Sequence, residues 1–179
     1  MSEFTPDEIR RLRELLDIEE IRKLGLLYSQ LQDHGYLDRL AAIFTTDAVC
    51  EFGPYGVWQG RETIRANYAK VQIDLGGQPF AALHANAHHW IEMTTPGTAV
   101  GRRSLLDMLT TGAPEQNPLL WLGVYDEAYR KEDGAWKIAR CSLQFLWPQR
   151  HLTPEFAAEF PPRAPATVYT TANCASEPT

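Results

Sequence analysis

Apolar residues in the N-terminal part of the chain recur at steps of three and four positions, the spacing of one face of an α-helix. The repeat runs through Ile9, Leu12, Leu16, Ile21, Leu24, Tyr28 and Leu31. Ahead of it, Thr5-Pro6-Asp7-Glu8 combines a capping hydroxyl, a first-turn proline and two acids at the positive end of the helix dipole. The pattern predicts one helix from this cap to about His34, where Gly35 ends it.

The next part of the chain predicts two shorter helices with a strand between them. Leu40, Ile43 and Phe44 indicate a helix over 37–44. Residues 47–52 have the pattern of a strand, followed by a turn at 54–56. A further helix is expected over 60–70.

The second half of the chain contains four long apolar-rich runs, at 83–93, 99–109, 120–131 and 136–147. Turn residues separate these runs, and short connections of this kind join antiparallel strands. Helices grouped on one side of an antiparallel sheet make an α+β fold. We expect a curved sheet whose open face, covered by helices, encloses a cone-shaped apolar pocket.

Composition narrows the class of protein. Of the 179 residues, 44% are hydrophobic, which suits one globular domain with a substantial core. The net charge of −6 and the absence of a basic stripe disfavour nucleic acids and anionic membranes as partners. Three scattered cysteines form neither a metal motif nor a disulfide framework, and no apolar run resembles a signal peptide or a membrane span. We therefore expect a cytoplasmic protein.

The composition changes after Trp147, where prolines become frequent. This boundary predicts a domain at 1–147 and a proline-rich C-terminal arm at 148–179. An arm of this kind can lie on a neighbouring subunit, and apolar surface on the outer face of the sheet would be a liability for a monomer. We expect a homo-oligomer, a dimer or trimer, with Trp121, Tyr129 and the arm as candidates for covering that face.

Three residues in apolar surroundings suggest chemistry: Asp33 closes the first helix, His84 opens a strand, and Tyr28 precedes Asp33 by five positions. An Asp–His pair inside an apolar cavity is a general base, and a nearby phenol can donate a proton. Simpler interpretations stay open: Asp33 as a solvated turn residue, His84 as a core or edge histidine, and Tyr28 as a core aromatic.

The geometry of the helix poses a difficulty for this set. On an ideal helix, five residues at roughly 100° each place Asp33 about 140° away from Tyr28. Both can line one cavity only if the sheet wraps the helix or the last turn unwinds. The leucines at 24, 26, 27 and 31 make the helix apolar around most of its girth, which favours wrapping.

Two more histidines follow His84 in the same predicted strand. Strand alternation places His88 on the face of His84 and His89 on the opposite face. His88 is therefore either a second pocket group or a structural residue. The His84–His88 spacing suits zinc on a helix, but this segment reads as a strand and lacks a carboxylate ligand, so no metal is predicted.

The aromatic residues Phe52, Trp58 and Phe145 are candidates for the pocket wall, which would suit a flat, cyclic, mostly apolar ligand. Arg102 and Arg103 project to opposite sheet faces, and the inward one needs a carboxylate partner or an anionic ligand. No phosphate-binding loop and no nucleophile elbow is present. No cofactor is predicted.

The order of several short motifs carries a family resemblance. Asp17 to Leu24 leads into Tyr28 and Asp33, followed by Asp38-Arg39-Leu40 and by Phe44-Thr45-Thr46-Asp47-Ala48. His84 then opens a strand that reaches Glu92, and Tyr129 to Ile138 ends the pattern. This ordered set resembles the SnoaL-like branch of the nuclear-transport-factor-2-like (NTF2-like) superfamily. That branch includes scytalone dehydratase, hexachlorocyclohexane dehydrochlorinase and bile acid 7α-dehydratase.

The resemblance implies an NTF2-like fold and assigns roles to individual residues. The catalytic dyad falls on Asp33 and His84, and the tyrosine of the bile acid enzyme on Tyr28. Other positions depart from the relatives: Arg103 stands where scytalone dehydratase has its second pocket histidine, and Tyr125 lies near its pocket asparagine. Phe145 replaces a late arginine of the bile acid enzyme.

These observations together favour a cofactor-independent lyase or isomerase for a small cyclic hydrophobic substrate, such as a steroid or polyketide-like compound. His84, oriented by Asp33, would remove a proton, and Tyr28 would assist the departing or enolising oxygen. Water loss is favoured over isomerisation or cyclisation. The alternative is a non-catalytic binding or adaptor module, including a role like that of a dioxygenase small subunit. Asp33 and His84 within hydrogen-bonding distance in one pocket would favour the enzyme.

Overall fold

The computed structural model describes residues 4–116 and 119–157. Three α-helices are present in these residues: α1 (Pro6–Asp33), α2 (Leu37–Ala42) and α3 (Arg61–Asp74). The start of α1 is the predicted cap, in which Thr5 and Glu8 exchange hydrogen bonds between side chain and backbone. None of these helices is long and apolar enough to cross a membrane.

Six strands form one sheet that is not closed into a barrel. They are β1 (Phe44–Glu51), β2 (Val57–Gln59), β3 (Ala82–Thr95), β4 (Thr98–Leu109), β5 (Leu119–Glu132) and β6 (Ala135–Trp147). Their order in the sheet is β2-β1-β6-β5-β4-β3. All neighbours are antiparallel except β1 and β6, which run parallel. The predicted α+β architecture is confirmed, with one parallel pair inside it.

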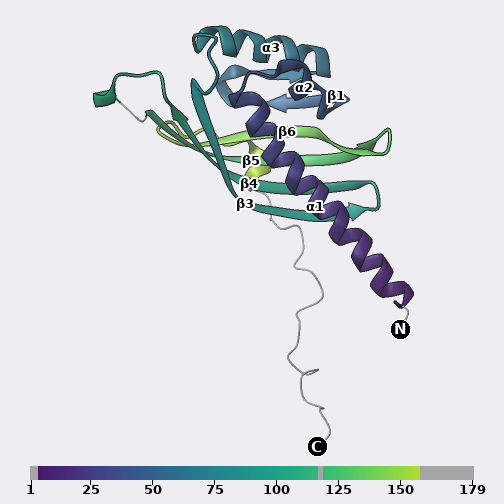
Figure 1. Cartoon of the computed structure of the whole chain (residues 1–179). Helices are drawn as coiled ribbons and strands as arrows, with labels where there is room; N and C mark the ends of the chain where they lie inside the picture. The colour runs from purple at the N-terminus through teal and green to yellow at the C-terminus, as the bar shows by residue number, and fades with distance from the viewer. Residues whose placement is uncertain (1–3, 117–118, 158–179) are drawn as a thin grey trace, which may run out of the picture.

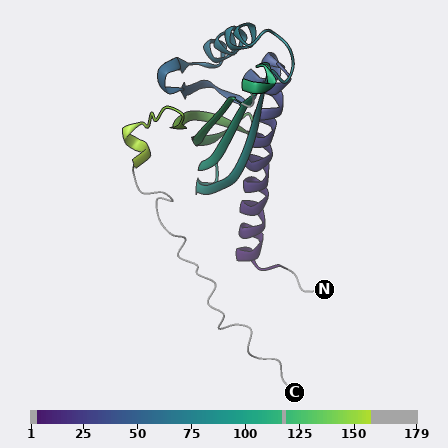
Figure 2. The ribbon, with the colours of Figure 1, turned by 90° about the vertical axis from the view of Figure 1, so that its left-hand side faces the viewer.

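The helices lie on one side of the sheet. Figure 1 shows α1 crossing the strands obliquely, with its N-terminal part projecting past them, and α2 and α3 together at the other end. In the turned view, α1 runs along one side of the sheet while α3 lies above its end (Figure 2). The core forms between them, where Ile21, Leu24, Tyr28 and Leu31 of α1 are buried.

Element boundaries differ from the sequence prediction where strand pairing competes with local pattern. Phe44, expected at the end of a helix, instead begins β1, because it pairs with Ile138 of β6. Residues 57–59, which carry no strand pattern, form β2 by pairing with the end of β1. In both places the long-range hydrogen bonds determine the structure rather than the local sequence.

A bulge in β3 reverses the predicted alternation of its histidines. Ala87 pairs with Ser104 but Trp90 pairs with Arg102, so β3 holds one extra residue between these two pairs. His88 sits at this irregularity with a positive φ of 53°. Its side chain is exposed, with Nδ1 3.3 Å from the Ser104 hydroxyl, while His89 turns inward. The prediction that His88 faces the pocket and His89 the outside is therefore wrong.

His89 joins a buried polar network around Arg103 and Glu127. The two side chains are fully buried and form a bidentate ion pair, with nitrogen–oxygen distances of 2.8 and 3.0 Å. The Tyr129 hydroxyl donates its proton to Glu127 at 2.7 Å. The same hydroxyl lies 3.0 Å from His89 Nε2 and can only accept there, so Nε2 is the protonated nitrogen of His89. The carboxylate partner required by an inward arginine is thus Glu127.

The network also reaches α1. Arg103 donates to the carbonyl oxygen of Gly25 at 3.2 Å. A Cβ atom at Gly25 would lie 2.8 Å from the His89 ring, so a glycine is needed where helix and network approach this closely. Burial alone would raise the pKa of Glu127, but the charge and hydrogen bonds of Arg103 lower it below the usual value.

Of the predicted arm at 148–179, the structure describes only 148–157. His151 exchanges backbone hydrogen bonds with Phe145, both at 2.9 Å, and the amide of Thr153 donates to the Gln144 side chain at 2.7 Å. A short 3-10 helix, η3 (Pro154–Ala157), follows. This part of the chain packs against its own sheet, while residues 158–179 lie outside the described residues, so an arm on a neighbouring subunit stays a prediction.

The Arg103–Glu127 pair generates a stability prediction. Glu127→Gln would leave a fully buried guanidinium without a counter-charge, so we expect the free energy of unfolding in urea to fall by about 3–5 kcal/mol. Asp47→Asn, which breaks an exposed pair with Arg130, is the control and should barely move the urea midpoint. Equal effects of the two substitutions would contradict a structural role for the buried pair.

His89 generates a second prediction, on pH. Burial lowers its pKa to about 4, opposed by the charge of Glu127 and reinforced by that of Arg103. In the unfolded chain a histidine binds its proton near pH 6.5. The stability contributed by neutral His89 is therefore present above that pH and is lost as the pH falls towards about 4.

His89→Gln should consequently flatten the acid side of the stability profile, measured by urea unfolding at about pH 7 and about pH 4.5. His88→Gln, at the exposed neighbouring position, is the matched control and should keep the wild-type pH dependence. If the stability of His89→Gln depends on pH as steeply as that of the wild type, groups other than His89 cause the loss of stability at low pH.

Candidate active site

A cavity of about 350 Å³ lies between α1, α3 and the inner face of the sheet. Its wall is mainly apolar, and its aromatic residues are Tyr28, Phe52, Tyr55, Trp58, Tyr68, Trp121, Tyr125 and Phe145. Four other polar side chains line it: Gln32, Asp74, His84 and Asp107. No lysine or arginine occurs among the described residues of the lining, so the cavity offers no positively charged side chain other than a protonated histidine.

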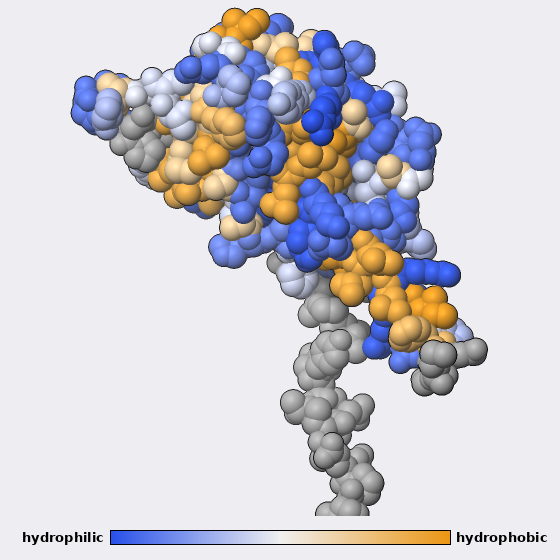
Figure 3. All heavy atoms as spheres, viewed as in Figure 1, coloured by the Kyte–Doolittle hydropathy of each residue, from blue (hydrophilic) through white to orange (hydrophobic). Residues whose placement is uncertain are grey.

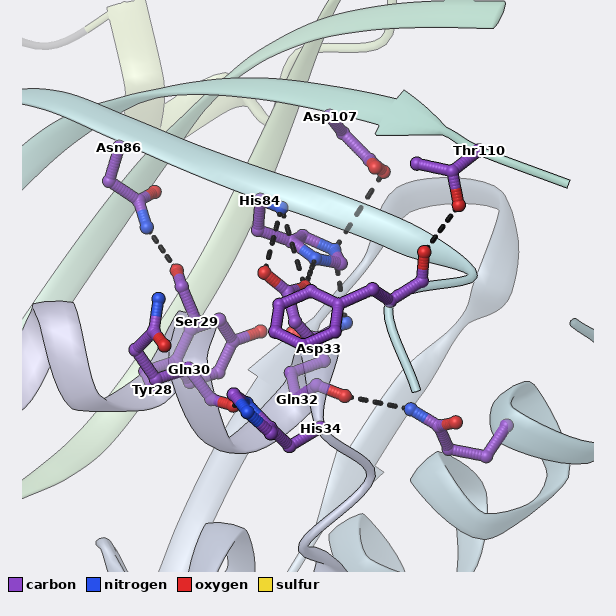
Figure 4. A network of polar contacts seen from close by, with 12 residues as sticks. Tyr28, Ser29, Gln30, Gln32, Asp33, His34, His84, Asn86, Asp107 and Thr110 are labelled. Atoms are coloured by element: carbon purple, nitrogen blue, oxygen red, sulfur yellow. Dashed lines mark hydrogen bonds and ion pairs between the residues drawn. The ribbon is translucent and has the colours of Figure 1, made fainter. Parts of the chain in front are cut away.

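The side chains of Asp33 and His84 point toward one another (Figure 4), and His84 lines this cavity. The distance between His84 Nδ1 and Asp33 Oδ1 is 2.5 Å. The backbone amide of His84 also donates to the same carboxylate, with its nitrogen 3.1 Å from Oδ2. The side chain of Asp33 is fully buried, and that of His84 is 8% exposed. The predicted hydrogen bond between the two residues is confirmed.

This arrangement fixes which ring nitrogen faces the cavity. A carboxylate can only accept, so Nδ1 carries the proton that is shared with Asp33. Nε2 then points away from Asp33 and accepts a hydrogen bond from the Gln32 side-chain amide at 3.1 Å, while Asp107 Oδ2 lies 3.8 Å away. His84 therefore presents an unprotonated nitrogen to a lined cavity, which is the geometry of a general base.

Local hydrogen bonds hold the end of α1 against the start of β3. The carbonyl oxygen of Asp33 accepts from the amide of Phe80 at 2.6 Å, just before β3 begins. Ser29 and Asn86 bond to each other across the same interface. From the other side, Gln72 of α3 donates to the carbonyl oxygen of Gln32 at 2.8 Å. These contacts fix the position of Asp33 relative to His84.

Tyr28 lines the same cavity as His84. Its hydroxyl lies 2.6 Å from that of Tyr68, and burial raises its pKa well above the usual value. Asp33 is not part of the cavity wall; it lies behind His84. The angular difficulty on α1 is thus resolved, because Tyr28 and the ring of His84 share the cavity while Asp33 faces another side of the helix.

The other residues singled out from the sequence divide into two groups. Phe52, Trp58, Tyr125 and Phe145 line the cavity as expected. Arg103 does not line it: the guanidinium lies behind the aromatic wall, 4.7 Å from the ring centre of Tyr28 and 4.2 Å from that of Tyr125. A direct substrate contact expected of Arg103 is therefore not supported by its position, since its hydrogen bonds go to Glu127 and Gly25.

His88 is the clearest departure, because the bulge in β3 places it on the outside and it is absent from the cavity wall. Conversely, sequence reasoning missed Gln32, Tyr68 and Asp107. Gln32 adjoins Asp33, which was a usable signal. Asp107 could not be found by counting residues along the β3–β4 hairpin. A hairpin with regular pairing from Thr95 and Thr98 would place Leu109 opposite His84, whereas two register shifts place Asp107 there.

No three histidine, cysteine, aspartate or glutamate side chains in the described part of the chain are grouped so that they could hold a metal ion. Cys50 and Cys141 are buried free thiols within the core.

Comparisons with known proteins agree with this description. A family model described as a SnoaL-like domain matches residues 13–142. None of the curated proteins matches the chain. Among solved structures, a candidate scytalone dehydratase from Novosphingobium aromaticivorans is 23% identical with a TM-score of 0.67, covering 82% of this chain and 98% of that one.

Two further structures share the fold at similar distance. An NTF2-like protein with a cystatin-like fold, also from a Novosphingobium aromaticivorans strain, is 20% identical with a TM-score of 0.71, covering 83% of this chain and 94% of that one. The hexachlorocyclohexane dehydrochlorinase LinA-type3 from Novosphingobium barchaimii is 21% identical with a TM-score of 0.65, covering 80% of this chain and 99% of that one. At these identities the likeness shows the fold alone.

Proposed function

This chain belongs to the SnoaL-like domain family, and we propose that it is a cofactor-independent lyase of the dehydratase type. Its substrate would be a small, cyclic, hydrophobic molecule that loses water. The observation that carries this proposal is the Asp33–His84 pair, which leaves His84 Nε2, the nitrogen not bonded to Asp33, at a cavity with many aromatic side chains. The solved dehydratase-like and dehydrochlorinase structures of the same fold support a reaction of this class.

In this reaction His84 Nε2 removes a proton from a carbon beside an electron-withdrawing group. The imidazolium that forms is stabilised by Asp33, whose carboxylate already holds Nδ1 and the backbone amide of His84. Because the carboxylate is buried, its interaction with the positive ring is stronger than it would be in water. No covalent intermediate with the protein is needed.

The Tyr28–Tyr68 pair supplies a hydrogen bond to the substrate. Its two hydroxyls are 2.6 Å apart, and Tyr28 also hydrogen-bonds Tyr125, so the three hydroxyl groups use two of their protons among themselves and leave one to point at a substrate oxygen. Burial raises the pKa of both phenols well above the usual value, so both stay protonated at ordinary pH. A carbonyl oxygen that gains negative charge during proton removal would be held by this pair.

The cavity favours an uncharged substrate. Its wall carries no lysine or arginine within the described residues, so a buried carboxylate or phosphate group of a substrate would find no cationic partner there. The aromatic side chains and the volume of about 350 Å³ suit a flat molecule of two or three rings. Steroid fragments, terpenoids and polyketide-like ring systems fall within this class.

A neutral cyclic β-hydroxy ketone tests the proposal. The probe 3-hydroxy-1-tetralone gives fluorescent 1-naphthol on losing water, so turnover can be followed directly. His84→Ala should reduce turnover by roughly 10²–10⁴-fold, the usual worth of a positioned base. Asp33→Asn should cost nearly as much, because the ring loses the partner that orients it. Tyr28→Phe should cost less, since Tyr68 can still offer a hydroxyl.

Thermal unfolding of the same variants provides the control, and none should melt at a much lower temperature than the wild type. A non-catalytic binding module would give another result: the probe would bind in the cavity, with affinity changed by Trp58→Ala, but no variant would alter the rate of 1-naphthol formation. That outcome would sink the enzyme proposal and leave a carrier or adaptor role, including one like a dioxygenase small subunit.

We also propose that the protein is a homo-oligomer, although not through Trp121 and Tyr129, two of the contacts expected from the sequence. Tyr129 lies in the core and Trp121 lines the cavity, so neither covers the outer face of the sheet. Figure 3 instead shows apolar side chains on the projecting part of α1. Leu15 and Leu16 there are 59% and 65% exposed. A helix segment without tertiary packing is marginally stable, and a second copy would cover it.

Sedimentation at micromolar concentration should therefore give a mass well above the 20.3 kDa of one chain. The double substitution Leu12→Glu and Leu16→Glu should reduce the mass to that of a monomer, because it places charge in the proposed contact. Substitution of the polar Arg13 by Glu in the same helix is the control. A wild-type protein that sediments only as a monomer would rule this assembly out.

A further inference from the structure

Asp107 is a second carboxyl group at the base of the cavity. It lies directly opposite His84 in the β3–β4 pair, so both side chains point to the same face of the sheet. Its Oδ2 is 3.8 Å from His84 Nε2, the nitrogen not bound to Asp33. The other oxygen, Oδ1, is buried and has no hydrogen-bond partner in the described residues. A buried carboxyl oxygen without a donor is costly unless the group is protonated or meets a ligand.

The surroundings of Asp107 favour its protonated form. Burial raises the pKa of its carboxyl group, and the charge of Asp33 adds to the effect while His84 opposes it. The groups that face it around the cavity are Tyr125 on β5, Tyr28 and Gln32 on α1, and Asp74 on α3. None of these carries a positive charge, so His84 is the cavity group that can act against the rise.

From this geometry we infer that Asp107 is the general acid that protonates the departing hydroxyl group. The inference rests on the proposed dehydration, in which one proton leaves a carbon and one is needed by the leaving oxygen. Hydroxide is a poor leaving group, so a reaction without an acid would be slow. The Tyr28–Tyr68 pair would hold the carbonyl oxygen, and Asp107 the hydroxyl, on the two sides of one substrate.

The protons balance within the site. His84 Nε2 takes the proton from carbon, the carbon–oxygen bond breaks, and the leaving oxygen receives the proton of Asp107, giving alkene and water. The site then holds a protonated His84 and an ionised Asp107. Because these two groups are 3.8 Å apart, the proton can return from Nε2 to Oδ2 by a small side-chain rotation once the product has left. No other reactant is required.

Two probes separate the base from the acid. Dehydration of 3-hydroxy-1-tetralone needs both groups. Ring opening of 5-nitrobenzisoxazole needs only a base, because its nitrogen–oxygen bond breaks to give a stable nitrophenolate. For Asp107→Asn, the ratio of kcat/KM for dehydration to kcat/KM for ring opening should fall by roughly 10²-fold, the lower end for a positioned acid. For His84→Ala, both conversions should be lost together.

The pH dependence of the ratio is a second readout. In the wild type, dehydration should decline relative to ring opening as the pH rises through the raised pKa of Asp107, because the acid loses its proton. In Asp107→Asn the ratio should not change with pH over that range. A purely structural carboxyl group would produce neither effect.

Controls keep the test decisive. Asp133→Asn makes the same side-chain change in the exposed β5–β6 turn, at the far end of β5 from the cavity, and should keep the wild-type ratio. If Asp107→Asn does not fold, Asp107→Leu extends the apolar wall formed by Leu105 and Leu109 and serves instead. Circular dichroism and the melting temperature report folding for each variant.

The outcomes are distinct. An unchanged ratio, or an equal loss of both conversions in Asp107→Asn, would overturn the assignment, since the group would then act on His84 or on the fold. If His84→Ala converts both probes at wild-type rates, His84 is not the base, and the role of Asp107 as the acid fails with it. If His84→Ala loses both conversions but Asp107→Asn leaves the ratio of kcat/KM values unchanged, His84 remains the proposed base and only the role of Asp107 as the acid is refuted.

Discussion

The site depends on the burial of one carboxylate at the wrong end of a helix. Asp33 is the last residue of α1, where the helix dipole is negative and disfavours an added negative charge. Its side chain has no exposure to water, so its charge must be satisfied by hydrogen bonds within the protein. The ring and the backbone amide of a single residue, His84, supply them. This requirement brings α1 and β3 together and at the same time sets the tautomer of the histidine.

The polar groups of the fold are arranged in two layers on either side of the aromatic wall. On the cavity side lie His84, Gln32 and Asp107. Behind Tyr28 and Tyr125 lies the Arg103–Glu127 pair, closed to water and bonded to α1. The two layers share the same helix, so a shift of α1 would disturb both. Fixed positions of this kind favour proton transfer, since a general base must be held within hydrogen-bonding reach of its proton.

Local pattern predicted most of the fold and part of the site. The cap of α1 and the four long strands followed from periodicity and turn residues, and the approach of Asp33 to His84 followed from the family resemblance. What failed depended on strand register. The bulge at His88 turned His89 inward, and the shifts in the β3–β4 pair placed Asp107 opposite His84. One extra residue in a strand inverts every following side chain, and alternation alone gives no sign of where it occurs. Arg103 was expected inside, but its partner Glu127 lies on another strand and could not be chosen from sequence.

Part of the cavity wall comes from residues that are close together in the sequence. Phe52, Trp58, Tyr68 and Leu75 all come from one continuous stretch, which forms β2, α3 and their connections. His84 and Asp107, the proposed base and acid, come from outside that stretch, as do Tyr125 and Phe145 of the wall. The stretch therefore shapes one part of the cavity without supplying the proposed base or acid. Exchange of this segment between relatives would alter which ring systems fit there while the proposed base stays in place.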